Sequence, residues 1–146
     1  MDTREMFARM IKCEAGGEGE HGMRAVATVI MNRVRVPYGE YQRLGQGDLR
    51  RLLAQEQQFQ CYEVELGGIP NNQNIWVIPA DAIHYQIADW AMNNNIHSGT
   101  GEDALWYMNP FIPDCPNFFP YNRNGYWFTR IGDHCIYNPT AGYADT

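Results

Sequence analysis

The stretch that decides the fold is EMFARMIKCEAGGEGEHGMRAVATVIMNRV, residues 5–34. Its apolar residues recur at helical spacing and predict a first helix over about residues 2–14. Gly16 and Gly17 follow that helix, as glycines commonly follow a helix C-terminus. The second predicted helix, about residues 21–34, is apolar on nearly all sides, so we expect it to lie at the centre of the fold. The supporting apolar positions are Met6, Phe7, Met10 and Ile11 in the first helix and Met23, Ala25, Val26, Ala27, Val29, Ile30, Met31 and Val34 in the second.

Glu14 has the most informative position in this stretch. It lies three and four positions beyond Ile11 and Met10, so it continues the helix face that should be buried. A carboxylate in the last turn of a helix meets the negative end of the macrodipole, and an inward position also removes it from water. Both effects penalise the charged form and raise the pKa, which suits a general acid working near neutral pH. The pattern leaves a second interpretation open, in which Glu14 pairs with Arg33 or lies at the surface of a frayed helix end.

The residues around Glu14 resemble the opening motif of a known family. The run Cys-Glu-Ala-Gly-Gly-Glu at residues 13–18, then Gly22, then a helix that ends in Asn-Arg-Val at residues 32–34, is similar to the start of the spore-cortex-lytic, cell-wall-hydrolase family (the SleB and CwlJ catalytic domain). One departure is Gly16, where the family usually has an arginine. This departure concerns the local support of the glutamate.

Three further segments resemble the family, in the same order along the chain, and the whole resemblance covers most of the sequence. They are Glu-Gln-Gln-Phe at 56–59, Ala-Leu-Trp-Tyr-Met-Asn-Pro at 104–110 and Ile-Gly-Asp-His at 131–134. A long insert, residues 111–125, separates the last two segments. We expect this insert to change the shape of the rim of the cleft.

The resemblance implies a lysozyme-like and lytic-transglycosylase-like helical core, with a small antiparallel sheet facing the catalytic glutamate across a groove. It implies a lytic transglycosylase in which Glu14 first protonates the oxygen that bridges muramic acid and glucosamine. Glu14 then acts as a base while the 6-hydroxyl of the same sugar closes a 1,6-anhydro ring. That scheme requires no second protein carboxylate, no metal and no other cofactor. The implied partner is a peptidoglycan glycan strand, with spore cortex as the substrate.

Candidate substrate-binding residues come from the family-like segments. Glu56 is a second candidate carboxylate. Gln58 could bind a sugar through its amide, and Phe59 could bind one through its ring. Ordinary rim polarity and a core position for Phe59 form the alternative interpretation. Tyr107 is our first choice for a stacking ring because it falls in a family-like segment, and Asn109 follows it with an amide suited to sugar hydroxyls.

Aromatic residues make up 13% of the chain and are crowded between Trp106 and Tyr143. Sugars present apolar CH faces and hydroxyl edges, so aromatic rings and amides suit a polysaccharide groove. Trp106, Tyr126 and Trp127 are further stacking candidates. The alternative is that most of these rings belong to the core.

Length and composition bound the function. At 146 residues, the chain should form one domain, residues 1–146, and we expect a monomer. Hydrophobic content of 45% and charged content of 19% are typical of a soluble globular protein. The net charge of −6, with Lys12 as the single lysine, argues against nucleic acid binding. No signal peptide is visible in residues 1–20, and the longest apolar run is too short to span a membrane.

The four cysteines, Cys13, Cys61, Cys115 and Cys135, allow three disulfide pairings, and their spacing selects none of them. Buried free thiols are an equal alternative. No Cys-x-x-Cys motif occurs, so a structural zinc site has little support.

The remaining sequence predicts an α+β domain. We expect a loop over residues 35–47, a helix capped by Asp48, a turn-rich connector at 67–74 and an extended segment at 75–78. Pro79 should open a helix that has Ala80 and Asp81 in its first turn and ends at residues 93–95, with His84 as a satisfied border residue. Residues 104–108 predict a strand, 126–131 and 135–137 predict a hairpin, and the tail after Asn138 should be loose.

Other functions remain open on the sequence alone. One is hydrolysis in which Glu56 or Glu18 holds a water molecule. A second is a cysteine amidase that uses Cys61 and His134, although Cys61 lacks the positive surroundings that lower a thiol pKa. A third is a wall-binding module without catalysis. The expected location is the cell wall or the spore cortex and coat, reached from the host or delivered by a phage.

Overall fold

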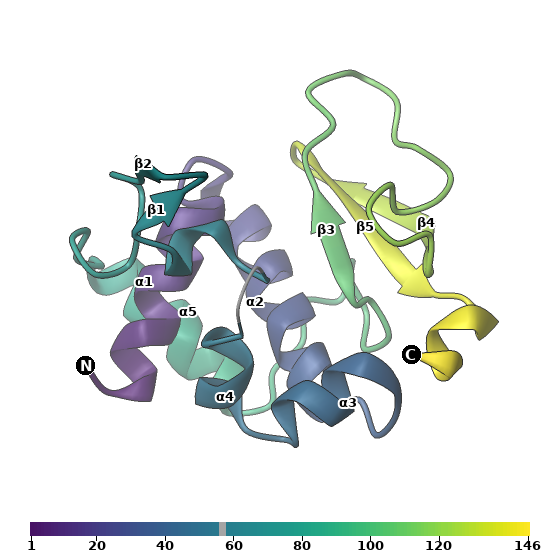
Figure 1. Cartoon of the computed structure of the whole chain (residues 1–146), viewed down its shortest axis with the longest axis horizontal. Coiled ribbons are helices and arrows are strands. Elements are labelled where there is room, and N and C mark those ends of the chain that lie inside the picture. The colour runs from purple at the N-terminus through teal and green to yellow at the C-terminus, as the bar shows by residue number, and fades with distance from the viewer. Residues whose placement is uncertain (56–57) are drawn as a thin grey trace.

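The computed structural model describes residues 1–55 and 58–146 and confirms an α+β fold. Helices gather on one side of the molecule, and a small sheet lies on the other (Figure 1). The helices are α1 (Thr3–Ala15), α2 (Gly19–Arg35), α3 (Gly39–Gly45), α4 (Leu49–Leu53) and α5 (Ala82–Met92), with short 3-10 helices η1 (Gln60–Tyr62) and η2 (Ala141–Asp145). The strands are β1 (Glu65–Leu66), β2 (Ile69–Pro70), β3 (Trp106–Met108), β4 (Gly125–Ile131) and β5 (His134–Pro139).

Helix α2 is central, as its apolar sequence predicts. Its residues from Met23 to Val34 are buried except for Arg24. Helices α1 and α5 both pack against α2 and against each other. The hydrophobic core continues from these helices into the sheet through Trp106 and Tyr137. Burial of this continuous apolar surface is the main force that joins the helical part to the sheet.

The larger sheet is antiparallel with strand order β3-β5-β4. Strands β4 and β5 form the predicted hairpin, which turns at Gly132 and Asp133. Gly132 has a φ of 59°, a left-handed conformation that favours glycine. Strand β3 pairs with the other edge of β5 and thereby faces the helices (Figure 1).

Aspartates begin three of the helices. Asp2 and Asp48 accept hydrogen bonds from the backbone N–H groups of Glu5 and Arg51, each at 2.8 Å. The predicted cap at Asp48 is therefore confirmed. Helix α5 starts later than predicted, because Asp81 is its N-cap rather than part of its first turn. His84 completes a capping box by accepting a hydrogen bond from the Asp81 N–H at 2.9 Å, so it is a satisfied residue.

Two of the predicted irregular or extended segments are wrong, and the turn-rich connector at 67–74 is confirmed. Residues 35–47 contain helix α3 in place of a continuous loop. The connector consists mainly of turns and bends, except for β2, which pairs with β1 across the turn at Gly67 and Gly68. Residues 75–78 form turns rather than an extended segment. In the last case, the backbone is held by a bond from the Trp76 N–H to the Asn74 side-chain oxygen at 2.9 Å.

The C-terminal tail is ordered by Tyr143, contrary to the prediction of a loose end. The Tyr143 ring is fully buried within η2. Its hydroxyl donates to the Tyr38 carbonyl at 3.0 Å and accepts from the Tyr41 N–H at 3.1 Å. The tail therefore fixes the start of helix α3.

Two disulfides decide between the alternatives left by the sequence. Cys13–Cys61 joins α1 to η1, and Cys115–Cys135 joins the 111–125 insert to β5. The described residues include no free cysteine. None of the described helices is long and apolar enough to cross a membrane.

Removing the Cys13–Cys61 disulfide should cost more stability than removing Cys115–Cys135, because the first closes a loop of 48 residues and the second a loop of 20. In the chain-entropy account the losses are about 4 and about 3 kcal/mol, respectively. Urea unfolding of the Cys13→Ser/Cys61→Ser and Cys115→Ser/Cys135→Ser variants measures both. Equal losses, or the reverse order, would contradict the chain-entropy account.

Candidate active site

A groove of about 750 Å³ runs between the helices and the sheet. Helices α1, α2 and α3, strand β3 and the 111–125 insert all contribute to its lining. The residues that matter most to its chemistry are Glu14, Arg33, Gln58, Tyr107, Asn109 and His134. The sequence elements that resemble the family therefore meet at one place in the fold.

Glu14 lies in the last turn of α1 and lines this groove. Burial raises its pKa from the ordinary value of 4.5 to about 7. The positive charge of Arg33 and a hydrogen bond with Tyr107 act in the opposite direction, because both favour the carboxylate. The balance leaves a carboxyl group that can both give and take a proton near neutral pH.

Glu14 also lines a second hollow, of about 480 Å³. This hollow is bordered by residues 12–18, which form the end of α1 and the turn into α2. Residue 14 therefore belongs to the lining of both hollows, a position that suits cleavage of an internal bond in a chain-like substrate.

Arg33 is the buried cation beside the groove, with 5% of its surface exposed. Its Nε donates to the Leu105 carbonyl at 2.6 Å, and its Nη1 donates to the Gln58 side-chain oxygen at 3.2 Å. Its guanidinium also lies over the Tyr41 ring, 4.7 Å from the centroid. Within the described residues, no Glu14–Arg33 ion pair forms within 4.0 Å, so the alternative of a simple structural pair for Glu14 is wrong.

Tyr107 connects the sheet to Glu14. Strand β3 places it beside the carboxyl group, opposite Ile136 of β5. Burial and the nearby charge of Glu14 raise the pKa of Tyr107 well above its ordinary value. Its hydroxyl therefore stays protonated and available as a hydrogen-bond donor. The His134 ring packs edge-on against Tyr107, with centroids 5.3 Å apart.

The other predicted binding residues differ in whether they line the groove. Gln58, Tyr107 and Asn109 line the groove. Phe59 is 1% exposed, so the prediction that its ring contacts a sugar is wrong. The ring centroid lies 5.6 Å from the Arg33 guanidinium carbon. Phe59 supports Arg33 from the core instead. Glu56 lies outside the residues that the structure describes.

The three further stacking candidates are not open to a ligand in the groove. Trp106 borders it but is 1% exposed, because it packs against Phe119 and Tyr143 in the core. Tyr126 and Trp127 are half-exposed on β4, the strand farthest from the helices (Figure 1). Alternation along a strand and pairing order, not aromatic content, decide which rings a groove can use.

Several groove residues were missed by sequence reasoning. Glu40 and Tyr41 come from α3, which the sequence predicted as a loop. Phe111 and Tyr121 come from the insert, for which only an altered rim was expected. The concentration of aromatic residues in that insert was the available signal.

Glu18 has a structural role. Its Oε2 accepts a hydrogen bond from the Asp133 N–H at 3.0 Å and so ties the α1–α2 turn to the β4–β5 turn. A Cβ at Gly132 would lie 2.8 Å from the same oxygen, so a larger residue would displace the Glu18 side chain as well as strain the left-handed backbone. Because Cys61 is bonded to Cys13, the predicted alternative of a Cys61–His134 nucleophilic pair is wrong. Among the described residues, no group of three or more His, Cys, Asp or Glu side chains could hold a metal ion.

Glu14→Gln should stabilise the fold in alkaline solution. The folded-state pKa of about 7 lies above the ordinary 4.5, so the folded state prefers the protonated carboxyl. The stability that this preference provides is present below about pH 4.5 and is lost as the pH rises through 7. At about pH 8 the variant should gain about 2 to 3 kcal/mol over the wild type, and in acid the gain should vanish.

Urea unfolding at several pH values measures this difference, with Glu102→Gln in the exposed loop before β3 as the matched control. A gain that does not depend on pH would argue against an elevated pKa at Glu14.

Comparison with known proteins gives a consistent result. The cell wall hydrolase CwlJ of Bacillus subtilis is 27% identical over 137 residues, which span 94% of this chain and 85% of that protein. CwlJ of Halalkalibacterium halodurans is 26% identical over 138 residues, with the same coverage. The catalytic domain of the germination-specific lytic transglycosylase SleB from Bacillus anthracis shares the fold, with a TM-score of 0.66, 21% identity and 93% of each chain covered.

The catalytic domain of Bacillus cereus SleB is similar, with a TM-score of 0.62 and 20% identity over 93% of this chain and 89% of that one. These similarities confirm the lysozyme-like arrangement of a helical core beside a small sheet. The sequence model of the cell wall hydrolase family matches residues 17–137, beginning just after Glu14. The chain belongs to the cell wall hydrolase family.

Proposed function

We propose that the protein cleaves peptidoglycan glycan strands as a lytic transglycosylase, at the bond between N-acetylmuramic acid and N-acetylglucosamine. The observation that carries this proposal is the Glu14 carboxyl, whose pKa of about 7 fits a single acid–base residue and which belongs to the lining of the groove. Membership of the cell wall hydrolase family supports the substrate class. The shared fold with proteins described as lytic transglycosylases is consistent with the reaction type.

The reaction begins with Glu14 protonated. Its proton passes to the bridging oxygen as the bond from that oxygen to C1 of the muramic acid breaks, and the glucosamine leaves as an alcohol. The positive charge that develops at C1 is met by the Glu14 carboxylate. That carboxylate then takes the proton of the 6-hydroxyl while the 6-oxygen bonds to C1. A 1,6-anhydro ring forms, Glu14 regains its proton, and no water is consumed.

Arg33 and Tyr107 fit the middle of this cycle. For a short interval Glu14 is charged in a poorly hydrated site, and both groups favour the charged form. Arg33 is fixed by the Leu105 carbonyl and Gln58, so it needs no reorganisation when the charge appears. Preorganised charge of this kind lowers the barrier to a step in which charge moves.

The substrate we propose is spore cortex or a related bacterial wall, so the protein would act at the wall or cortex. The named relatives support this location, since one is a cell wall hydrolase and another is described as germination-specific. A hydrolytic reaction is the second candidate, because Glu40 lines the same groove as Glu14 and would be the second carboxylate. Glu18 is a weaker choice for that role, because its carboxylate accepts the Asp133 N–H.

Glu14→Gln should lower the rate of glycan release from purified peptidoglycan by at least about a hundredfold, because the amide cannot donate or accept the catalytic proton. Wild-type products should carry 1,6-anhydro ends, which mass spectrometry finds lighter than reducing ends by one water. Glu18→Gln is the matched control and should keep most of the activity, since a glutamine oxygen can still accept the Asp133 N–H.

Full activity in Glu14→Gln would remove Glu14 as the catalytic residue. If the wild-type products carry reducing ends and Glu40→Gln no longer forms them, the reaction is hydrolysis and not transglycosylation. Anhydro products that persist in Glu40→Gln would support the single-carboxylate scheme.

The pH dependence of cleavage should follow the protonated form of Glu14, so the rate should fall as the pH rises through about 7. Tyr107→Phe removes a hydrogen bond that favours the carboxylate, so it should raise the pKa and move this alkaline limb to higher pH. Initial rates across a pH series measure the shift, and Tyr126→Phe on the outer strand is the control. An alkaline limb that moves to lower pH would show that Tyr107 acts in another way.

A further inference from the structure

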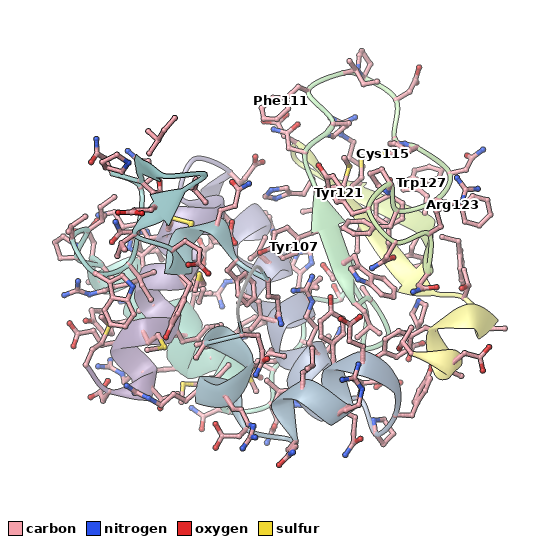
Figure 2. All side chains as sticks on the ribbon, in the orientation of Figure 1. Tyr107, Phe111, Cys115, Tyr121, Arg123 and Trp127 are labelled. Carbon is pink, nitrogen blue, oxygen red and sulfur yellow. A yellow bond between two sulfur atoms is a disulfide. The ribbon has the colours of Figure 1, made fainter. Side chains whose placement is uncertain are left out.

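Two of the most exposed aromatic rings in the described structure belong to the insert and line the groove. Phe111 is 87% exposed and Tyr121 is 79% exposed, yet both border the same hollow as Glu14. Figure 2 shows Phe111 and Tyr107 along the side of the sheet that faces the helices, whereas Arg123 lies toward the opposite side. Core packing does not account for rings that remain this open to water.

The insert that carries these rings is firmly attached to the sheet. The Cys115–Cys135 disulfide joins it to β5, and the Tyr137 hydroxyl donates to the Pro116 carbonyl at 2.8 Å. Arg130 of β4 donates through Nη1 to the carbonyls of residues 112 and 113, at 3.0 and 2.6 Å. The backbone of the insert beside Phe111 is therefore anchored at the rim, which lowers the entropy cost of ordering this segment when a ligand binds.

Phe111 is held in a conformation that a bulky residue rarely adopts. Its φ is 58°, in the left-handed region. The Asn109 side-chain oxygen accepts the Phe111 N–H at 2.8 Å and fixes this turn. Glycine or asparagine would suit the backbone better, so the fold alone gives no reason for a phenylalanine here. Unfavourable backbone conformations of this kind cluster at binding sites.

We propose that Phe111 and Tyr121 form an aromatic wall that binds a pyranose ring of the glycan strand at a distance from the bond that is cleaved. The wall is continuous with the Glu14 groove, so its occupant is a further sugar of the same strand. The apolar CH face of a β-linked hexosamine can stack on an exposed ring, and the Asn122 amide, which also lines the groove, can bind the hydroxyl or acetamido edge. This inference rests on the proposed function. It implies that the 111–125 insert makes the protein bind long glycan strands more tightly than short ones.

The test measures binding without turnover. In a Glu14→Gln background, calorimetry compares a disaccharide with an octasaccharide, both prepared from peptidoglycan glycan without stem peptides. Phe111→Gly/Tyr121→Ala should reduce the affinity advantage of the octasaccharide by about tenfold, which corresponds to losing two stacking contacts. Phe118→Ala is the matched control: Phe118 lies in the same insert, is 42% exposed and is absent from the groove lining. It should leave the advantage unchanged.

Two further measurements separate a binding role from a structural one. Phe111→Gly should melt at the wild-type temperature or higher, because glycine accepts the left-handed φ. Phe111→Trp keeps a ring and should retain the preference for the octasaccharide. The proposed aromatic wall would be contradicted if Phe111→Gly/Tyr121→Ala kept the preference for the octasaccharide. It would also be contradicted if Phe118→Ala lost this preference to the same extent.

The wall and the proposed function can fail separately. If the wild type cleaves peptidoglycan but its length preference does not depend on Phe111 and Tyr121, the aromatic wall is contradicted and the proposed function stands. Loss of that preference in the wall variant, in a protein that releases no glycan fragments, would uphold the wall and reject the cleavage reaction.

Discussion

The site depends on one balance at Glu14, between the cost of burying a carboxylate and the groups that favour its charge. Burial raises its pKa to about 7, while Arg33 and Tyr107 limit the rise. Without Arg33 and Tyr107, the carboxyl would hold its proton too firmly to act as a base. Without the burial, it would be ionised at neutral pH and could not act as an acid. The three side chains come from α1, α2 and β3, so the balance requires the whole tertiary fold.

Most of the remaining structure keeps the sheet in place against the helices. The continuous core through Trp106 supplies the adhesion, and the Glu18–Asp133 hydrogen bond fixes one end of the sheet beside the α1–α2 turn. Cys13–Cys61 holds η1 against α1, next to Glu14. A shift of the sheet would move Tyr107 away from the carboxyl group and change its proton affinity. Catalytic geometry and stability are therefore coupled, and the buried carboxyl is tolerated at a cost in alkaline solution.

The sequence predicted those features that local patterns control. Periodicity over residues 5–34 located both central helices and placed Glu14 on the inner face, and turn chemistry at Gly132 located the β4–β5 hairpin. Features that depend on distant partners were missed. Helix α3 and the ordered tail rely on Tyr143, whose hydroxyl bonds to backbone groups of Tyr38 and Tyr41, about a hundred residues away. Similarly, the sequence does not show whether an aromatic residue such as Phe59 contacts a ligand or packs beside a buried guanidinium, as Phe59 does.

The central claim is that a buried carboxyl at residue 14 holds its proton near neutral pH. Carbon NMR of the glutamate side-chain carboxyls, titrated with pH and assigned by the signal that disappears in Glu14→Gln, measures this proton directly and needs no substrate. The structure predicts that the Glu14 signal titrates with a pKa of about 7. Titration at the ordinary value of 4.5 would contradict the account, because the residue would then be a carboxylate throughout the range in which it is required to be an acid.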